Sequence, residues 1–277
     1  MHGPRHMIVD VLSGLDTTRP WWSPLRAWLP GHPHYAAVLQ AAAGMGSPIP
    51  VAPLLNALAP PACPVRFTNQ SALPAGMAYE QFIGQHGMCP TRDNLHDFFN
   101  GLCWFRFPKI KTLFNKIQCR QILRQGVGQR RGVVRDTITL LDEGGLLLQA
   151  PPALWNAIEQ RDWRRAFIKE RALWQQTHIG IIGHALLEKC VNPYKAITAN
   201  VIRVPQDTPA GDLDLVMAHT LETLLTEDPL QVKPHRPLPV MGIPGWDAAN
   251  EDPAFYDDPL VFRPPRASGP SRSLLPV

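Results

Sequence analysis

The chain has 277 residues, of which 45% are hydrophobic and 18% charged, as in a globular protein large enough to bury a core. No window approaches the run of about 20 apolar residues that a membrane span requires, and the first residues lack an apolar segment of signal-peptide length. Five scattered cysteines without a CxxC pair suggest neither a zinc ribbon nor a disulfide framework. We therefore expect a cytoplasmic protein with free thiols and no membrane partner.

Proline is concentrated at both ends of the chain. The sequence holds 30 prolines, and many lie before residue 75 or after residue 228. We predict a Pro-rich N-terminal arm over residues 1–64 packed on the body, a main domain over 65–266 and a disordered tail over 267–277. The main domain is predicted to be a single α+β unit, dominated by helices, with a small antiparallel sheet.

The first half of the chain is predicted to be mostly helical. The clearest helix spans residues 91–105, with Thr91 as its N-cap and with Leu95, Phe98 and Leu102 on one apolar face. A basic helix over 109–124 follows Pro108. The other elements predicted here are helices over 35–43, 51–58 and 79–86 and a strand over 65–68.

The second half is predicted to mix strands and helices. Residues 137–149 have the pattern of a hairpin, with Asp142, Glu143 and two glycines as its turn. Trp163, Phe167 and Trp174 mark the apolar stripe of one helix. The remaining predicted elements are helices over 179–190 and 212–225 and a strand over 197–204.

Four strings of the sequence carry a family likeness. They are YEQFIGQHGMCPTRDNLHDFFNGLCWFRFPK, RDTITLLDEGG, GHALLEK and PVMGIPGWDAANEDPAFYDDPLVFRPPR. Together they resemble an uncharacterised proteobacterial family, the domain of unknown function numbered 3025, over roughly residues 65–266. The resemblance implies a bacterial protein of one conserved architecture, and it implies no activity.

Polar residues recur on one face of the predicted 91–105 helix, namely Asp93, His96, Asp97 and Asn100. An imidazole beside two carboxylates is a ligand set suited to Mg, Mn, Fe or Zn, and a carboxylate could equally orient a general-base histidine. A solvent-facing polar stripe explains the same pattern, so both interpretations stay open. Because Trp104 continues this stripe with an apolar ring, we predict that the stripe lines a groove.

Two further places in the sequence are candidates for the same site. His184 and Glu188 have the i, i+4 spacing that puts them on one helix face, where they could share a metal or a proton, or form an ordinary surface pair. Asp136 lies beside arginines at the start of a predicted strand and is placed to face a cleft.

These candidates are predicted to meet in space. The predicted catalytic residues are His96, Asp97, Asp136 and His184. The predicted ligands of a divalent metal are His96, Asp97 and Glu188. Their approach is what would distinguish a site from isolated polar residues.

The segment 106–135 holds nine lysines and arginines and no acidic residue. Such a charge bias indicates an anionic partner, or an acidic face of the same protein. The predicted anion-binding residues are Lys109, Lys116, Arg120, Arg124, Arg130 and Arg131.

The sequence lacks a P-loop, a dinucleotide-binding glycine pattern, a GxSxG elbow and an HExxH motif. Three functions remain. The favoured one is binding of a nucleic acid or another polyanion through segment 106–135. The alternatives are a metal-dependent hydrolase or nuclease that uses the His/Asp cluster, and an interaction module without a catalytic site.

Overall fold

The part of the chain that the structure describes contains a four-stranded sheet and a two-stranded sheet. A short apolar run, Leu146 to Leu148, lies in a central strand of the four-stranded sheet. The computed structural model describes residues 8–42, 49–125, 132–226 and 233–264. Strand β3 (Gly145–Gln149) is buried along its whole length, because it has neighbours on both edges and helices or loops on both faces. It pairs antiparallel with β4 (His178–Ile181) and parallel with β5 (Thr198–Val204), and β6 (Arg236–Pro239) pairs antiparallel with β5.

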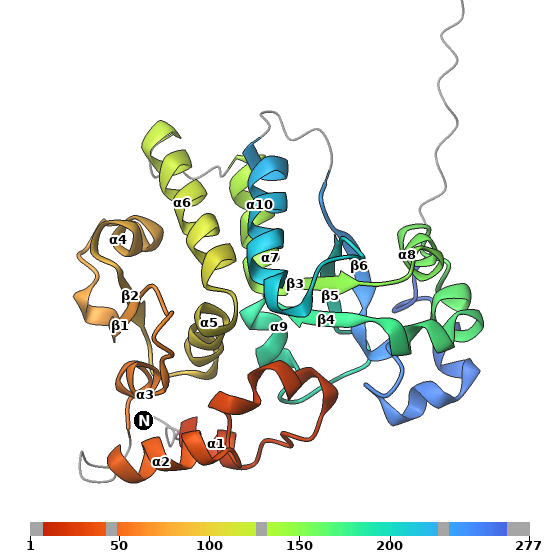
Figure 1. Cartoon of the computed structure of the whole chain (residues 1–277), viewed down its shortest axis with the longest axis horizontal. Coiled ribbons are helices and arrows are strands. Elements are labelled where there is room, and N and C mark those ends of the chain that lie inside the picture. Colours follow the sequence, from red (N-terminus) through yellow and green to blue (C-terminus); the bar gives the residue numbers. More distant parts are fainter. Residues whose placement is uncertain (1–7, 43–48, 126–131, 227–232, 265–277) are drawn as a thin grey trace, which may run out of the picture.

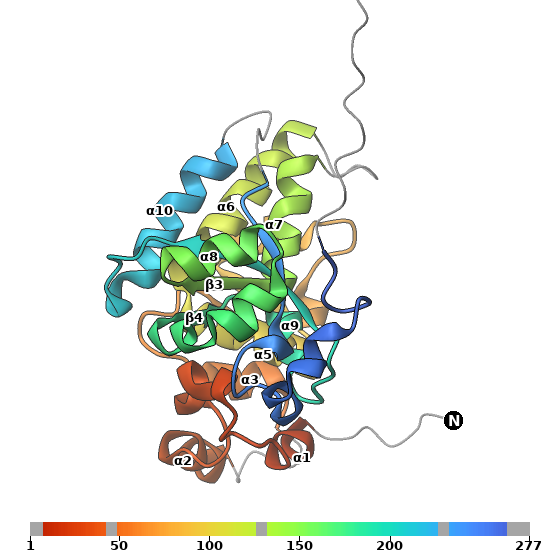
Figure 2. The same ribbon diagram turned by 90° about the vertical axis from the view of Figure 1, so that its right-hand side faces the viewer.

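The two faces of this sheet belong to two apolar clusters. Leu147 and Ile202 pack against α6 (Pro108–Gln125), α7 (Val133–Gly144) and α10 (Leu213–Thr226). Figures 1 and 2 show these three helices together on one side of the sheet. Leu146 and Leu148 belong to the other cluster, which is rich in aromatic rings and includes α8 (Pro152–Glu159).

The remaining elements lie before or beside this sheet. A two-stranded parallel sheet pairs β1 (Arg66–Asn69) with β2 (Met88–Thr91). The other helices are α1 (Ile8–Ser13), α2 (Pro33–Ala42), α3 (Val51–Leu58), α4 (Tyr79–His86), α5 (Leu95–Arg106) and α9 (His184–Lys189). None of the helices in the described ranges is long and apolar enough to cross a bilayer.

Aromatic stacking attaches the N-terminal residues to α5. The rings of Trp22 and Phe99 stack with centroids 5.4 Å apart and an interplanar angle of 12°. Trp21 contacts Trp246 near the other end of the chain, also at 5.4 Å. Asn56 in α3 exchanges two hydrogen bonds with the backbone of Phe67 in β1, at 2.7 and 2.9 Å. The boundary at residue 64 stays a prediction, and the 267–277 tail lies outside the described residues.

The predicted fold class, α+β and dominated by helices, is confirmed. The predicted 137–149 hairpin is wrong, because residues 133–144 form helix α7 and only 145–149 form a strand. Val134, Ile138 and Leu141 recur at i, i+4 and i+7 and are buried together. The burial of this helical apolar stripe outweighs the strand preference of the β-branched residues. The sheet is also mixed and not purely antiparallel.

Three of the predicted helices also differ from the structure. The 91–105 helix begins at Leu95, since Met88–Thr91 pairs as strand β2 and Asn94, not Thr91, is the N-cap. The 179–190 helix is strand β4 followed by the short α9. Instead of one helix, the Trp163 to Trp174 region contains a π-helical turn and a 3-10 helix.

Candidate functional site

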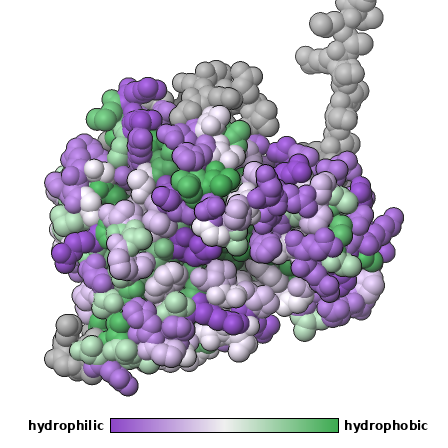
Figure 3. Space-filling view, in the orientation of Figure 1, coloured by the Kyte–Doolittle hydropathy of each residue, from purple (hydrophilic) through white to green (hydrophobic). Residues whose placement is uncertain are grey.

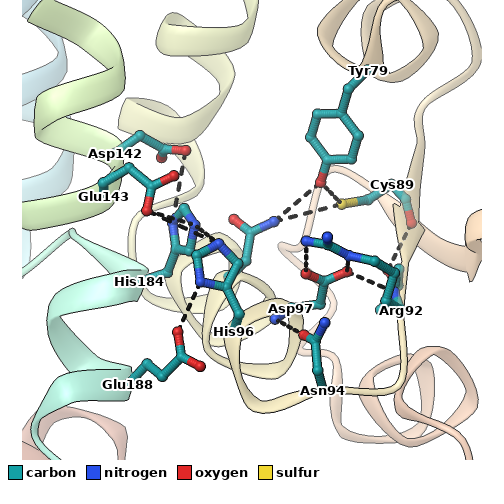
Figure 4. Close-up of polar contacts among 12 residues, drawn as sticks. Tyr79, Cys89, Arg92, Asn94, His96, Asp97, Asp142, Glu143, His184 and Glu188 are labelled. Carbon is teal, nitrogen blue, oxygen red and sulfur yellow. Dashed lines mark hydrogen bonds and ion pairs between the residues drawn. The ribbon is translucent and has the colours of Figure 1, made fainter.

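Helices α5, α7 and α9 bring three side chains that could bind a metal close together (Figure 4). His96 comes from the first turn of α5, Glu143 from the last turn of α7, and His184 is the first residue of α9. The two Nε2 atoms of His96 and His184 lie 2.9 Å apart. Glu143 Oε2 lies 4.0 Å from His96 Nε2 and 3.8 Å from His184 Nε2. The predicted approach of the two histidines is therefore confirmed.

A glycine allows α9 to begin this close to α7. A Cβ atom on Gly183 would lie 2.4 Å from the backbone nitrogen of Gly145 and 2.7 Å from the carbonyl oxygen of Glu143. The Gly183 amide instead donates a hydrogen bond to the Gly145 carbonyl at 2.9 Å. His184, the next residue, is thereby held against the end of α7.

Each histidine has a carboxylate behind its other ring nitrogen. Glu188 Oε2 lies 2.9 Å from His96 Nδ1. Asp142 Oδ2 lies 3.7 Å from His184 Nδ1, which has no hydrogen-bond partner. Carboxylates in these positions favour the tautomer protonated at Nδ1, in which the Nε2 lone pair is free to bind a metal.

Burial sets the charges of this group. It lowers the pKa of His184 to about 4, so that this imidazole is neutral near neutral pH. It raises the pKa of Glu143 above its ordinary value. Burial also acts to raise the pKa of Asp142, but the positive charge of Lys111 outweighs it and holds that pKa below its ordinary value.

Beneath the histidines lies a buried ion pair. The ammonium group of Lys111 contacts the Asp142 carboxylate, donates a hydrogen bond to Asn100 Oδ1 at 2.9 Å and lies 5.4 Å from the centroid of the Trp104 ring. Its neighbour Asp142 raises the pKa of Lys111 despite burial. We call Lys111, Asp142 and Asn100 the site floor, and it fixes Asp142 behind His184.

The two histidines line a cleft of about 490 Å³. His96 and Asn100 both line it, as predicted for the polar stripe of α5, whereas Trp104 is packed in the core. The other polar lining residues are Gln70, Tyr79, Glu80, Arg92, Asp97, Gln118, Arg135, Thr139, Asp142, Glu143 and His184.

Three sequence predictions for this site need correction. Asp97 is not a metal ligand here, because its carboxylate is engaged by the backbone amide and the guanidinium of Arg92, at 2.6 and 2.8 Å. Asp136 is exposed in the first turn of α7 and does not line the cleft. Glu188 contacts the Nδ1 side of His96, so it supports that ring from behind.

The sequence reasoning missed Glu143 and Lys111. It assigned Glu143 to a hairpin turn, although the Val134, Ile138 and Leu141 stripe places Glu143 at the end of a helix. It counted Lys111 only among the nine positive charges of segment 106–135, although Lys111 falls on the apolar face of α6 with Ile110 and Phe114. A helical wheel of residues 108–125 would have placed Lys111 on that buried face. A wheel of residues 133–144 puts Glu143 opposite the apolar stripe, so tertiary packing alone brings it to the histidines.

The predicted anion-binding residues lie apart from the cleft. Lys109, Lys116, Arg120 and Arg124 are exposed on α6, and Arg130 and Arg131 lie outside the described residues. Figure 3 shows hydrophilic residues over the upper end of α6, beside an apolar patch over α10. Lys111 and Arg135 of the same basic segment are buried, so its nine charges do not form one continuous surface.

The fold and site define a helix-dominated α+β protein with a two-histidine, one-glutamate cluster in a cleft. The family model of a protein of unknown function (DUF3025) matches residues 65–266, and the chain belongs to that family. No curated protein and no solved structure matches the chain.

Proposed function

We propose that the protein is a metal-dependent hydrolase whose divalent metal is held by His96 Nε2, His184 Nε2 and the Glu143 carboxylate. The observation that carries this proposal is the 2.9 Å contact of two Nε2 atoms whose rings both face carboxylates at Nδ1. If both rings carry their proton at Nδ1, two lone pairs face each other and repel. A cation between them would remove that conflict and give both Nε2 lone pairs a partner.

The spacing of the three side chains is close to what such an ion needs. With metal–nitrogen bonds of about 2.0–2.1 Å, a tetrahedral ion would hold two nitrogen ligands about 3.3 Å apart, so the 2.9 Å between the two Nε2 atoms would widen by about 0.4 Å. The Glu143 side chain is 45% exposed, so it is free to rotate the remaining distance toward the ion.

Three protein ligands leave a coordination position open for water or substrate. A zinc ion in such a site lowers the pKa of bound water to about 7, which supplies a nucleophile at neutral pH. The 490 Å³ cleft gives a small substrate access to that position. Hydrolysis is the reaction that requires least beyond these groups.

Metal analysis tests this proposal. Protein purified without a histidine tag or chelator should contain about one zinc or manganese ion per chain, and His96→Asn, His184→Asn or Glu143→Gln should each lose it. His219→Asn, on the exposed side of α10, is the matched control and should keep the metal. Hydrolysis of nitrophenyl ester and phosphoester probes should follow metal content.

Two results would contradict the proposal. Metal content that is absent from the wild type, or indifferent to all three substitutions, would remove the metal site. Stoichiometric iron with turnover of dioxygen would keep the site and replace hydrolysis, because two histidines and a carboxylate also hold iron in oxygenases.

A second candidate function is binding of a polyanion, including nucleic acid, along α6. It is supported by the exposure of Lys109, Lys116, Arg120 and Arg124 on one helix. In the described ranges, none of these four cations takes part in a salt bridge. This surface is separate from the metal cluster, and the two functions are testable independently.

A further inference from the structure

One face of α7 runs along the cleft from the metal cluster to its far end. Arg135, Thr139, Asp142 and Glu143 are spaced at i, i+4, i+7 and i+8, and all four line the cleft. With a rise of 1.5 Å per residue, the backbone positions of Arg135 and Glu143 are about 12 Å apart along the helix. Arg135 therefore sits roughly one small-molecule length from the cluster.

Arg135 is a buried cation that forms no salt bridge with a carboxylate of the described residues. Burial raises the pKa of Glu80, and the charges of Lys111 and Arg135 partly offset that rise. Its side chain is only 9% exposed, and its Nε donates a hydrogen bond to Gln118 Oε1 at 3.3 Å. Among the described residues, no carboxylate forms a salt bridge with it, and its two terminal nitrogens have no hydrogen bond. Those nitrogens are not among the sealed, unsatisfied atoms either, so they open into the cleft that Arg135 lines.

The other charged side chains along the cleft already have hydrogen-bond or ion-pair partners. Arg92 holds Asp97 at 2.8 Å, and Lys111 holds Asp142. The Glu80 carboxylate accepts a hydrogen bond from Asn115 Nδ2 at 2.6 Å. Of the two arginines that line the described cleft, Arg135 alone has a guanidinium left for a ligand.

From this we infer that the substrate of the proposed hydrolase carries a carboxylate, which Arg135 binds at the far end of the cleft while the reacting bond lies at the metal. The inference rests on the proposed function. The planar guanidinium fork matches a planar carboxylate with two parallel hydrogen bonds. One arginine beside a neutral glutamine suits a single negative charge, whereas a phosphate dianion would face Glu80 with no second free cation.

Hydroxamate probes test the inference. A hydroxamate group binds the metal, and a spacer with an extended length from about 4 to about 10 Å carries a terminal carboxylate toward Arg135. Each probe has a twin that ends in a neutral carboxamide. Titration calorimetry on the zinc-loaded full chain should show that, for one spacer length, the carboxylate binds about 10- to 100-fold more tightly than its twin.

Variants assign this preference to Arg135. Arg135→Gln should abolish the preference because it weakens the carboxylate probe far more than its carboxamide twin, and Arg135→Lys should retain part of it. Arg120→Gln removes the same charge from the exposed side of α6 and should keep the full preference. Metal content and thermal melting of each variant show that the site and the fold persist.

The possible results distinguish a failure of the Arg135 assignment from a failure of the metal site. If both twins bind equally at every spacer length, or the preference survives Arg135→Gln, the Arg135 assignment is overturned and the metal site stands. If a phosphonate-tipped probe binds more tightly than the carboxylate, the substrate class is overturned. If no hydroxamate binds, the metal site fails and this inference fails with it.

Discussion

The site floor and the histidine pair above it are both partly or fully buried polar clusters, yet their bonding differs. In the floor, the Lys111 ammonium donates to a carboxylate and to an amide oxygen, so cation and anion are matched. In the pair, His96 and His184 present nitrogens to each other while their other nitrogens face carboxylates. Short distances alone therefore do not indicate a ligand site. The proposed metal site rests on that difference, because two rings that both carry their proton at Nδ1 have Nε2 lone pairs that only an added ion would match.

The largest expected effect comes from breaking the floor. Lys111→Met leaves the Asp142 carboxylate buried without its cation, and we expect a loss of about 3–5 kcal/mol in the free energy of unfolding. Urea denaturation measures the loss. His184→Asn, measured in chelator, should change stability by much less, because it removes the unmatched pair of nitrogens.

Two comparisons sharpen that result. Lys116→Met, on the exposed side of the same helix, should change stability by no more than about 0.5 kcal/mol. Adding Asp142→Asn to Lys111→Met should recover part of the loss, since no charge then stays buried and unpaired. A Lys111→Met variant as stable as wild type would show that the floor is not a structural ion pair.

A smaller effect, mainly on metal binding, is expected for Glu188. Its carboxylate lies behind His96 and is 40% exposed, so Glu188→Gln should cost at most about 1 kcal/mol of stability. The same substitution should weaken zinc binding about 10- to 100-fold, because the ring of His96 loses the group that orients it. Competition with a fluorescent zinc chelator measures the affinity. Equal affinity in the two proteins would mean that Glu188 forms only a surface pair.

The smallest expected effect concerns the exposed face of α6. If about four cations reach phosphates, the log–log dependence of nucleic-acid affinity on salt should have a slope of roughly −3 to −4. Replacing Lys109, Lys116, Arg120 and Arg124 with Gln should flatten the slope and weaken binding to every sequence alike. Titration of labelled single- and double-stranded nucleic acid at two salt concentrations measures it. Absence of binding at low salt would refute this function and leave the metal site untouched.

Local periodicity predicted the helices that carry a clear stripe. Residues 51–58 and 79–86 form the predicted helices, and the latter ends at Gly87, whose φ of 63° favours glycine. The pattern failed for residues 137–144 and 179–182. Short apolar runs rich in Ile, Leu and Thr suit a strand or a buried helix, and only their tertiary neighbours decide between the two.

Part of the site was also predictable from local spacing in the sequence. His96 and His184 were predicted as site residues because each has a carboxylate at helical spacing. Spacing within one helix is the same in the folded protein as in the sequence pattern. Asp97, predicted as a metal ligand from the same helical spacing, is engaged elsewhere, and Asp136, predicted as a catalytic residue from its position beside arginines, does not line the cleft. Arg92 engages Asp97, and the helical conformation of residues 133–144 turns Asp136 outward.

By itself, the sequence determined the fold class, the family and the short stretches where chemistry is concentrated, because these depend on composition, spacing and neighbouring residues. The tertiary structure alone decided which of those residues meet. His96 and Glu188 are 92 residues apart, and Lys111 and Asp142 are 31 apart. Their contacts depend on how α5, α6, α7 and α9 pack, down to a glycine at residue 183 that has no room for a side chain. Packing of this kind is a property of the whole core, and no local pattern encodes it.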